Sequence, residues 1–370
     1  MAAGGSLSRL QQSAPPAPAR KGLRSKLAAA SRTTRDRINK LDVVQFSLRG
    51  FLLKFRIRHL SGPKRLSSAP GDVIAISVVR NGTLWIPSFL AHHRKLGVRH
   101  FVVLDNGSED DTREMLASEP DVTLLQTDAP YHAYENTMKR YLAERYCRDR
   151  WCLCVDVDEL FEYPFQNQAP LSALVAYLDE HKYNAVVTQM LDVFSDIPLN
   201  RLESRPGDDL KATFRHYDLS AVRKTGYILG DVEEQIAFHR GGIRNLVFGT
   251  DNGLTKVSFF KMDGQLEPFI QWHHVRNGRF ADVSCVLLHY PFVSTFYAKV
   301  ADAVRTGRYG YMTSNEYVRY QARLENADDL HLRQPTSKVY ASAEALIDEG
   351  FLYASPAYRR TLAGEQADPG

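Results

Sequence analysis

The sequence contains few cysteines and no long apolar run. Its 370 residues include four cysteines, whose spacing matches neither a zinc site nor a disulfide framework: Cys147, Cys152, Cys154 and Cys285. A membrane-spanning helix needs roughly 18 uncharged apolar residues, and the most apolar stretch near the N-terminus, residues 43–60, contains four basic residues. We therefore expect free thiols in a reducing compartment and no membrane span.

The first 70 residues differ in composition from the rest of the chain. They lack the compact apolar region and the small-residue cleavage site of a secretory signal, and they carry 15 Lys and Arg against two acids. Their net charge is +13, so residues 71–370 carry −9. This composition predicts a largely disordered segment, or else a polybasic arm that binds anionic lipid through an interfacial helix. That helix would present Phe46, Phe51, Leu52, Leu53 and Phe55. No basic motif with interleaved aromatic residues supports nucleic-acid binding.

Apolar runs and amphipathic stretches alternate between residues 72 and 155. The pattern predicts strands at 72–79, 100–104, 122–126 and 151–155, and helices at 85–96, 112–118 and 133–147, with Gly97 as a C-cap. This order is typical of an α/β fold with a Rossmann-like, mostly parallel sheet and helices on both faces. A helix at 171–180, a strand at 185–190, loop-like residues at 196–235 and short strands within 236–292 follow. We expect three regions: the basic segment 1–70, an α/β domain 71–295, and a helical, Tyr-rich extension with a flexible tail, 296–370.

The loops after the predicted strands are polar. Ligands of parallel sheets bind outside the carboxyl ends of the strands, where this chain has Arg80-Asn81, Asp105-Asn106 and Asp156-Val157-Asp158-Glu159. Two carboxylates at positions 156 and 158 can point into one cleft. Mn²⁺ and Mg²⁺ bind carboxylate and phosphate oxygens, which suits a nucleotide diphosphate. The alternative is an acidic helix N-terminus that Asp158 or Glu159 caps.

Four segments between residues 74 and 164 resemble the bacterial family 2 glycosyltransferases of the GT-A fold. They are Ile76-Ser-Val-Val-Arg-Asn81, Phe89-Leu-Ala-His-His-Arg-Lys-Leu-Gly97, Val103-Leu-Asp-Asn-Gly-Ser-Glu-Asp110 and Trp151-Cys-Leu-Cys-Val-Asp-Val-Asp-Glu-Leu160. Weaker similarity continues through Gly241-Gly242-Ile-Arg244, Leu254-Thr-Lys256 and Leu287-Leu-His-Tyr290. The resemblance thus covers about residues 72–292. At one position the chain departs from it, because relatives commonly have an acid where Gly82 stands.

The resemblance implies that residues 71–295 form a metal-dependent, inverting glycosyltransferase domain. Its donor would be a UDP- or GDP-sugar, with Asp105 at the base, Asp156 near the ribose or the metal, and Asp158 as ligand of Mn²⁺ or Mg²⁺. His289 would complete the metal shell. Further candidates for nucleotide-sugar binding are Arg80, Asn81, Arg244 and Lys256. Together with the basic segment 1–70, the resemblance predicts a cytoplasmic enzyme that is in peripheral contact with anionic membrane at the inner membrane face. It would act on a saccharide or lipid-linked acceptor in surface polysaccharide or glycoconjugate synthesis.

Several of these residues also have a structural interpretation. A carboxylate is needed to deprotonate the acceptor, and Asp192, shortly after a predicted strand, is the first candidate before Asp196, Asp231, Glu233 and Glu234. His289 would otherwise be a core histidine, and Gly241–Arg244 a tight turn. His92 and His93 are expected to pack or lie at the surface.

Two other functions fit parts of the pattern. A sugar-phosphate nucleotidyltransferase shares the sheet and the acidic metal site, but it usually carries a Gly-rich phosphate loop after the first strand, where this chain has only Arg80-Asn81-Gly82. A non-catalytic, membrane-associated scaffold on a transferase fold is the second alternative. The presence of Asp105, Asp156 and Asp158 argues against the scaffold, and donor binding distinguishes the two.

Overall fold

The structure, a computed structural model, describes residues 48–67, 69, 71–227, 230–271, 274–307, 309, 311–327 and 329–364. The chain divides after residue 49 into two compact units, and the helices and strands described below belong to the second, Gly50–Gly370. Phe46 and most of the basic segment 1–70 lie outside the described residues, so the expectations for them are not tested. None of the described helices combines the length and the apolar character needed to cross a membrane.

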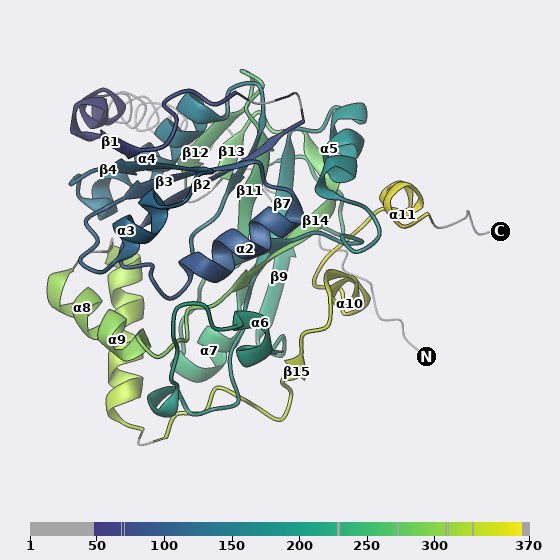
Figure 1. Cartoon of the computed structure of the whole chain (residues 1–370). Coiled ribbons are helices and arrows are strands. Elements are labelled where there is room, and N and C mark those ends of the chain that lie inside the picture. The colour runs from purple at the N-terminus through teal and green to yellow at the C-terminus, as the bar shows by residue number, and fades with distance from the viewer. Residues whose placement is uncertain are drawn as a thin grey trace, which may run out of the picture. The chain divides into compact units, whose positions relative to one another are not determined.

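A nine-stranded sheet forms the centre of this unit, in the order β1-β4-β3-β2-β5-β11-β7-β14-β6 (Figure 1). Six strands run in one direction: β2 (Val73–Val79), β3 (His100–Asp105), β4 (Val122–Gln126), β5 (Trp151–Cys154), β7 (Ala185–Asp192) and β14 (Phe280–His289). Three run against them: β1 (Arg58–Ser61), β6 (Glu159–Glu162) and β11 (Thr255–Lys261). The predicted α/β fold with a mostly parallel sheet is confirmed.

Helices cover both faces of the sheet because its strands are apolar on both sides. On one face the strand residues Val73 and Ala75 share a buried cluster with Phe89 of α2, and on the other Ile74 and Ile76 share one with Met138 of α4. The predicted helices are present as α2 (Ile86–Leu96), α3 (Thr112–Ala117), α4 (Tyr131–Tyr146) and α5 (Leu171–Glu180). Gly97 closes α2 in the left-handed conformation, at φ 109°.

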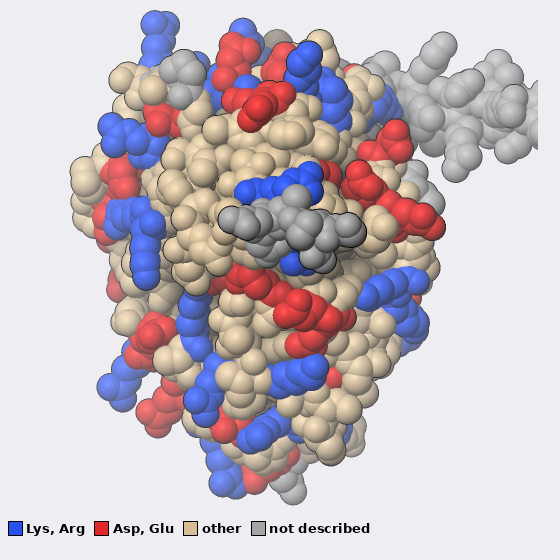
Figure 2. All heavy atoms as spheres, turned by 90° about the vertical axis from the view of Figure 1, so that its right-hand side faces the viewer, with Lys and Arg blue, Asp and Glu red and all other residues tan. Residues whose placement is uncertain are grey.

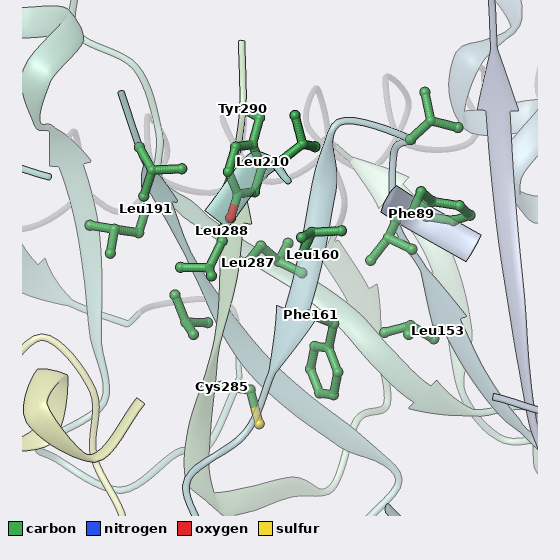
Figure 3. Close-up of a cluster of buried hydrophobic side chains, with 14 of the residues drawn as sticks. Phe89, Leu153, Leu160, Phe161, Leu191, Leu210, Cys285, Leu287, Leu288 and Tyr290 are labelled. Carbon is green, nitrogen blue, oxygen red and sulfur yellow. The ribbon is translucent and has the colours of Figure 1, made fainter. Parts of the chain in front are cut away.

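The first cluster continues into the half of the sheet that contains β6, β7 and β14. Leu160 and Phe161 of β6 pack there with Leu287 of β14 and Leu191 of β7 (Figure 3). These contacts fix the end of β14 next to the turn between β5 and β6. His289 at the end of β14 therefore lies next to the turn that contains Asp156 and Asp158, although these residues are far apart in the sequence.

The remaining elements lie outside the nine-stranded sheet, and most of them, apart from α8 and α9, are short. They are α6 (Leu210–Thr213), α7 (Ile243–Phe248), α8 (Phe296–Thr306), α9 (Tyr311–Glu325), α10 (Ala343–Asp348), α11 (Pro356–Ala363), a 3-10 turn (Leu199–Arg201), and the pairs β10 (Ala237–Gly241) with β9 (Val222–Gly226), β12 (Glu267–Gln271) with β13 (His274–Arg276), and β15 (Lys338–Val339) with β8 (His216–Tyr217). The C-terminal helices α8 and α9 pack side by side (Figure 1).

Three local features of the structure differ from the expectations. The ordered body begins before Gly71, since β1 pairs with β4 and Leu53 is fully buried. The region 196–235, expected to be loop-like, contains α6, β8 and β9. The acids at 156–159 lie in a turn that leads into β6 rather than at a helix N-terminus, so the capping alternative does not apply.

The described atoms on one face of the molecule carry basic and acidic side chains side by side (Figure 2). This face offers no broad basic surface of the kind that nucleic-acid binding uses.

Candidate functional site

A cavity of about 520 Å³ opens at the carboxyl ends of β2 and β5. Its walls come from the loops after β2 and β3, the β5–β6 turn, the end of β14, and α8. Its charged lining comprises two basic and five acidic side chains, a net −3 with neutral histidine: Arg80, Lys299, Glu109, Asp110, Asp156, Asp158 and Asp302. The volume is typical of small-molecule sites, but an anionic ligand here requires an additional cation.

Asp158 and His289 meet at the floor of this cavity. His289 Nε2 lies 3.6 Å from Asp158 Oδ2, and the backbone N–H of Tyr290 donates to the carbonyl oxygen of Asp158 at 2.8 Å. Burial raises the pKa of Asp158, but Lys299 and His289 outweigh it and hold this pKa well below its usual range. Burial lowers the pKa of His289, whereas Asp158 and Asp192 raise it to about 9. The two side chains therefore form a tight, oppositely charged pair.

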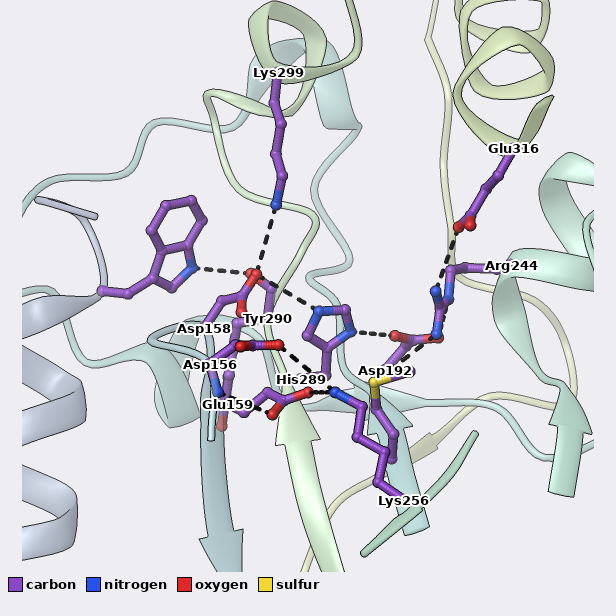
Figure 4. A network of polar contacts seen from close by, with 12 residues as sticks. Asp156, Asp158, Glu159, Asp192, Arg244, Lys256, His289, Tyr290, Lys299 and Glu316 are labelled. Carbon is purple, nitrogen blue, oxygen red and sulfur yellow. Dashed lines mark hydrogen bonds and ion pairs between the residues drawn. The ribbon is translucent and has the colours of Figure 1, made fainter. Parts of the chain in front are cut away.

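Behind His289, a chain of charged side chains extends away from the cavity (Figure 4). His289 Nδ1 lies 2.6 Å from Asp192 Oδ1, and Arg244 Nε donates to Asp192 Oδ2 at 2.7 Å. Arg244 also faces Glu316 of α9 at 3.4 Å. Asp192 is 2% exposed, and neither it nor Arg244 lines the cavity. Both oxygens of Asp192 are engaged, so it orients His289 instead of facing an acceptor.

Two lysines hold Asp156 from the side of the protein core. Lys139 Nζ lies 3.2 Å from Asp156 Oδ1, and Lys256 Nζ lies 3.7 Å from Asp156 Oδ2 and forms an ion pair with Glu159. Burial raises the pKa of Asp156, but these two ammonium groups shift it below its usual value. Lys256 does not line the cavity. Asp156 reaches the cavity already neutralised and is not brought to His289.

Lys299 enters the cavity from α8, opposite the sheet. Its Nζ lies 3.6 Å from Asp158 Oδ2 and 5.7 Å from the centroid of the Trp85 ring. Trp85 is fixed by its indole N–H, which donates to the carbonyl oxygen of Tyr290 at 2.9 Å. The sequence analysis missed Lys299 and Lys139. A signal for Lys299 exists, because it is the one basic residue between the Leu287–Tyr290 segment and Asp302.

The loops after β2 and β3 close the opposite wall. Arg80 and Asn81 line the cavity, and they are tied to the second loop: Arg80 Nη2 donates to Glu109 Oε1 at 2.8 Å, and Asn81 Oδ1 accepts from the Glu109 N–H at 2.8 Å. Asp105 is fully buried and does not line the cavity. Its carboxylate accepts from the backbone N–H groups of Gly107 and Ser108 at 3.1–3.3 Å. Asp105 thus shapes the loop, and Asn106 is its cavity-facing neighbour.

The position of Gly82 explains the missing acid. A Cβ on Gly82 would lie 2.6 Å from Val79 Cγ2, closer than real Cβ contacts come. Its N–H donates to Thr112 Oγ1 at 2.7 Å. A side chain can be placed here only if the side chain of Val79 or the end of β2 shifts.

The other candidates of the sequence analysis lie away from the cavity. Asp196 faces Arg333 at 3.9 Å, and Asp231, Glu233 and Glu234 do not line it. Gly241 and Gly242 form a tight turn, at φ 92° and 69°, in front of α7. His93 packs in the core.

The residues at the cavity floor fit a divalent cation that shares its shell with a ligand. No group of three or more His, Cys, Asp or Glu side chains in the described part of the chain could hold a metal by itself. Mg²⁺-type sites, however, use one or two carboxylates together with phosphate oxygens and water. Asp158 and His289 offer a carboxylate oxygen and, once the proton on Nε2 is displaced, an imidazole nitrogen 3.6 Å apart. The contact of His289 Nδ1 with Asp192 is the arrangement that metal-binding histidines usually have.

Comparisons with known proteins identify no family. No protein-family model and no curated protein sequence matches the chain. Solved structures with some likeness include HddC from Yersinia pseudotuberculosis, at 8% identity, covering 62% of this chain and 96% of that one, TM-score 0.30. Another is the mannosyltransferase PcManGT from Pyrobaculum calidifontis in complex with GDP-Man and Mn²⁺, at 14% identity, covering 76% and 77%, TM-score 0.26. A third is the inositol-1-phosphate CTP transferase from T. maritima, at 11% identity, covering 80% and 97%, TM-score 0.24. At these TM-scores the likeness carries no argument about the activity of this chain.

Proposed function

We propose that the cavity binds a nucleotide-diphosphate sugar and that the protein is an inverting, metal-dependent glycosyltransferase. The observation that carries the proposal is the pair Asp158 and His289, brought within 3.6 Å at the floor of a cavity that the strand ends line. The resemblance to family 2 glycosyltransferases points to the same residues, Asp158 within 74–164 and His289 within the weaker similarity at Leu287–Tyr290.

Each wall of the cavity has a role in this proposal. Arg80, Asn81 and Asn106 bind the nucleoside half of the donor, and Asp105 holds their loops in place. Asp156, neutralised by Lys139 and Lys256, accepts from a sugar or ribose hydroxyl. Asp158 and His289 would hold Mn²⁺ or Mg²⁺, which supplies a fixed positive charge beside the phosphate oxygens.

The transfer requires one proton acceptor. The acceptor oxygen forms a bond to the anomeric carbon while the bond from that carbon to the diphosphate oxygen breaks, and the hydroxyl proton passes to a carboxylate. Asp192 is enclosed by His289 and Arg244, so we assign the proton to a carboxylate among those that line the cavity. The acceptor that we propose is a hydroxyl of a saccharide or a lipid-linked saccharide.

The helical residues 50–56 at the start of the second unit carry exposed aromatic side chains that could bind a membrane. Phe51 and Phe55 are 58% and 75% exposed on the helical residues 50–56, while Leu53 between them is fully buried. With the basic charge of residues 1–70, we propose peripheral binding to anionic membrane on the cytoplasmic side. The double change Phe51→Glu and Phe55→Glu should abolish cosedimentation with phosphatidylglycerol vesicles, and Val339→Glu, also at an exposed position, should not. Equal binding by both variants would remove the membrane proposal.

Calorimetric titration with UDP and GDP, with Mn²⁺ or with EDTA, tests the donor site. We expect metal-dependent binding of one of the two, lost in Asp158→Asn, and release of the diphosphate when the sugar donor and an acceptor are supplied. Binding of a nucleoside triphosphate with release of pyrophosphate from a sugar 1-phosphate would favour the nucleotidyltransferase instead. No binding of any nucleotide would favour the scaffold.

A further inference from the structure

The C-terminal helix α8 brings a single lysine into the cavity. Phe296 and Val300 are buried and do not line the cavity, whereas Ala303 is buried and lines it. Ala298, Lys299 and Asp302 also line the cavity. The side chain of Lys299 is 32% exposed, and its ammonium lies between Asp158 and the Trp85 ring.

No described contact of Lys299 is of hydrogen-bond length to a carboxylate. Its ammonium is 3.6 Å from Asp158 Oδ2, the same distance at which His289 Nε2 faces that oxygen. Asp158 therefore has two cationic neighbours, one from the sheet and one from α8. A divalent cation held by Asp158 and His289 would offset the charge of this carboxylate, and a phosphate oxygen of the bound nucleotide would then be the anion available to Lys299.

The surroundings of Lys299 favour a compact, highly charged partner. Trp85 supports the ammonium with its ring face, and the Tyr309 and Tyr317 rings stack at 4.8 Å on the same wall of the cavity. The ammonium lies at the cavity wall between Asp158 and the Trp85 ring, a position from which it can contact a phosphate oxygen.

We propose that Lys299 binds the diphosphate of the donor from the side of α8, across the cation site from His289, and stabilises the negative charge of the departing nucleoside diphosphate. This inference rests on the proposed function. It assigns to the C-terminal extension a direct part in donor binding. The expected contact reaches the terminal phosphate, so it distinguishes a nucleoside diphosphate from a nucleoside monophosphate.

Calorimetry in Mn²⁺ with UDP, GDP and their monophosphates tests this assignment. A charge-assisted contact to phosphate predicts that Lys299→Met weakens diphosphate binding about 10- to 100-fold and monophosphate binding less than about threefold. Lys299→Arg should restore most of the difference. Lys95→Met, which removes an exposed lysine of α2 outside the cavity, should change neither. Lys299→Gln serves as a second test should the methionine variant not fold.

The outcomes separate the two proposals. If the unaltered protein binds a nucleoside diphosphate and the Lys299 variants bind it equally well, the assignment of Lys299 is wrong and the proposed function stands. Equal weakening of diphosphate and monophosphate binding would also overturn the assignment, because Lys299 would then only shape the cavity. If the unaltered protein binds no nucleoside diphosphate, with or without Mn²⁺, the proposed function falls and the assignment falls with it.

Discussion

Replacing Asp192 by asparagine separates two roles for this residue, proton acceptor and support of His289. The asparagine side chain would keep the size of the aspartate but lose the charge that faces His289 at 2.6 Å and Arg244 at 2.7 Å. Outer-shell changes of this kind typically lower metal affinity 10- to 100-fold. We expect a decrease of that order in the affinity for Mn²⁺ measured with saturating nucleoside diphosphate, and recovery of turnover at high Mn²⁺.

The same substitution should lower stability by an amount that burial sets. Asp192 is 2% exposed and Arg244 10%, and removing one partner of a buried pair costs about 3 kcal/mol or more. For a unit of this size that corresponds to a decrease in Tm of roughly 4–5 °C. Glu144→Gln makes the same chemical change in a half-exposed pair with Arg140 and should leave Tm nearly unchanged.

One result would refute this reasoning. If Asp192→Asn keeps its affinity for Mn²⁺ and its Tm but shows no turnover at any Mn²⁺ concentration, Asp192 is the proton acceptor. The bonds to His289 and Arg244 would then not describe the working site.

Three further predictions concern the metal pair, acid sensitivity and the missing acid. Asp158→Asn should weaken Mn²⁺-dependent nucleotide binding at least about tenfold without a comparable effect in EDTA, as calorimetry would show; equal loss in both conditions would contradict a metal role. Burial lowers the pKa of His239 to about 3 and of His274 to about 4, and it also lowers that of His93. Below about pH 6.5 the unfolded chain therefore binds more protons than the folded chain. Urea unfolding should show that the free energy of unfolding falls as the pH decreases, by up to about 1.4 kcal/mol per pH unit for each of these histidines. A urea midpoint that does not change between about pH 6.5 and 4.5 would contradict this. Gly82→Glu, which restores the acid of the resembling family, should lower Tm and weaken nucleotide binding because its Cβ would collide with the side chain of Val79. A variant that binds as well as the unaltered protein would contradict this and show that Val79 or the end of β2 adapts.

The fold was predictable because its signal is local. Continuous apolar runs such as Val73–Val79 and the helical spacing around Phe89 determine an element without reference to distant residues. β1 was not predictable in this way, since its four residues have an alternating, partly exposed pattern and join the sheet only through pairing with β4.

A place at the cavity could be predicted for Asp156 and Asp158 because they closely follow a strand, whereas His289, the last residue of β14, was indicated only by the family resemblance. The residues that form ion pairs with these charged side chains could not be predicted. Asp192, Arg244 and Lys256 carry charges that suggest ligand contacts, yet they bind charged side chains from other elements. Lys139 looks like an ordinary residue of an amphipathic helix, and only its burial at 1% reveals its link to Asp156. Such pairings depend on tertiary geometry, which no local pattern contains.

The line of charges from Lys299 through Asp158, His289, Asp192 and Arg244 to Glu316 (Figure 4) joins the β5–β6 turn and the ends of two strands to α7, α8 and α9. During synthesis, a nascent chain that ends before α8 has its whole central sheet but neither Lys299 nor Glu316. Its buried Arg244 lacks one counter-charge, and its cavity lacks one wall. A product truncated there is thus incomplete at the place where we propose donor binding, so the proposed activity requires that α8 and α9 have been made and docked.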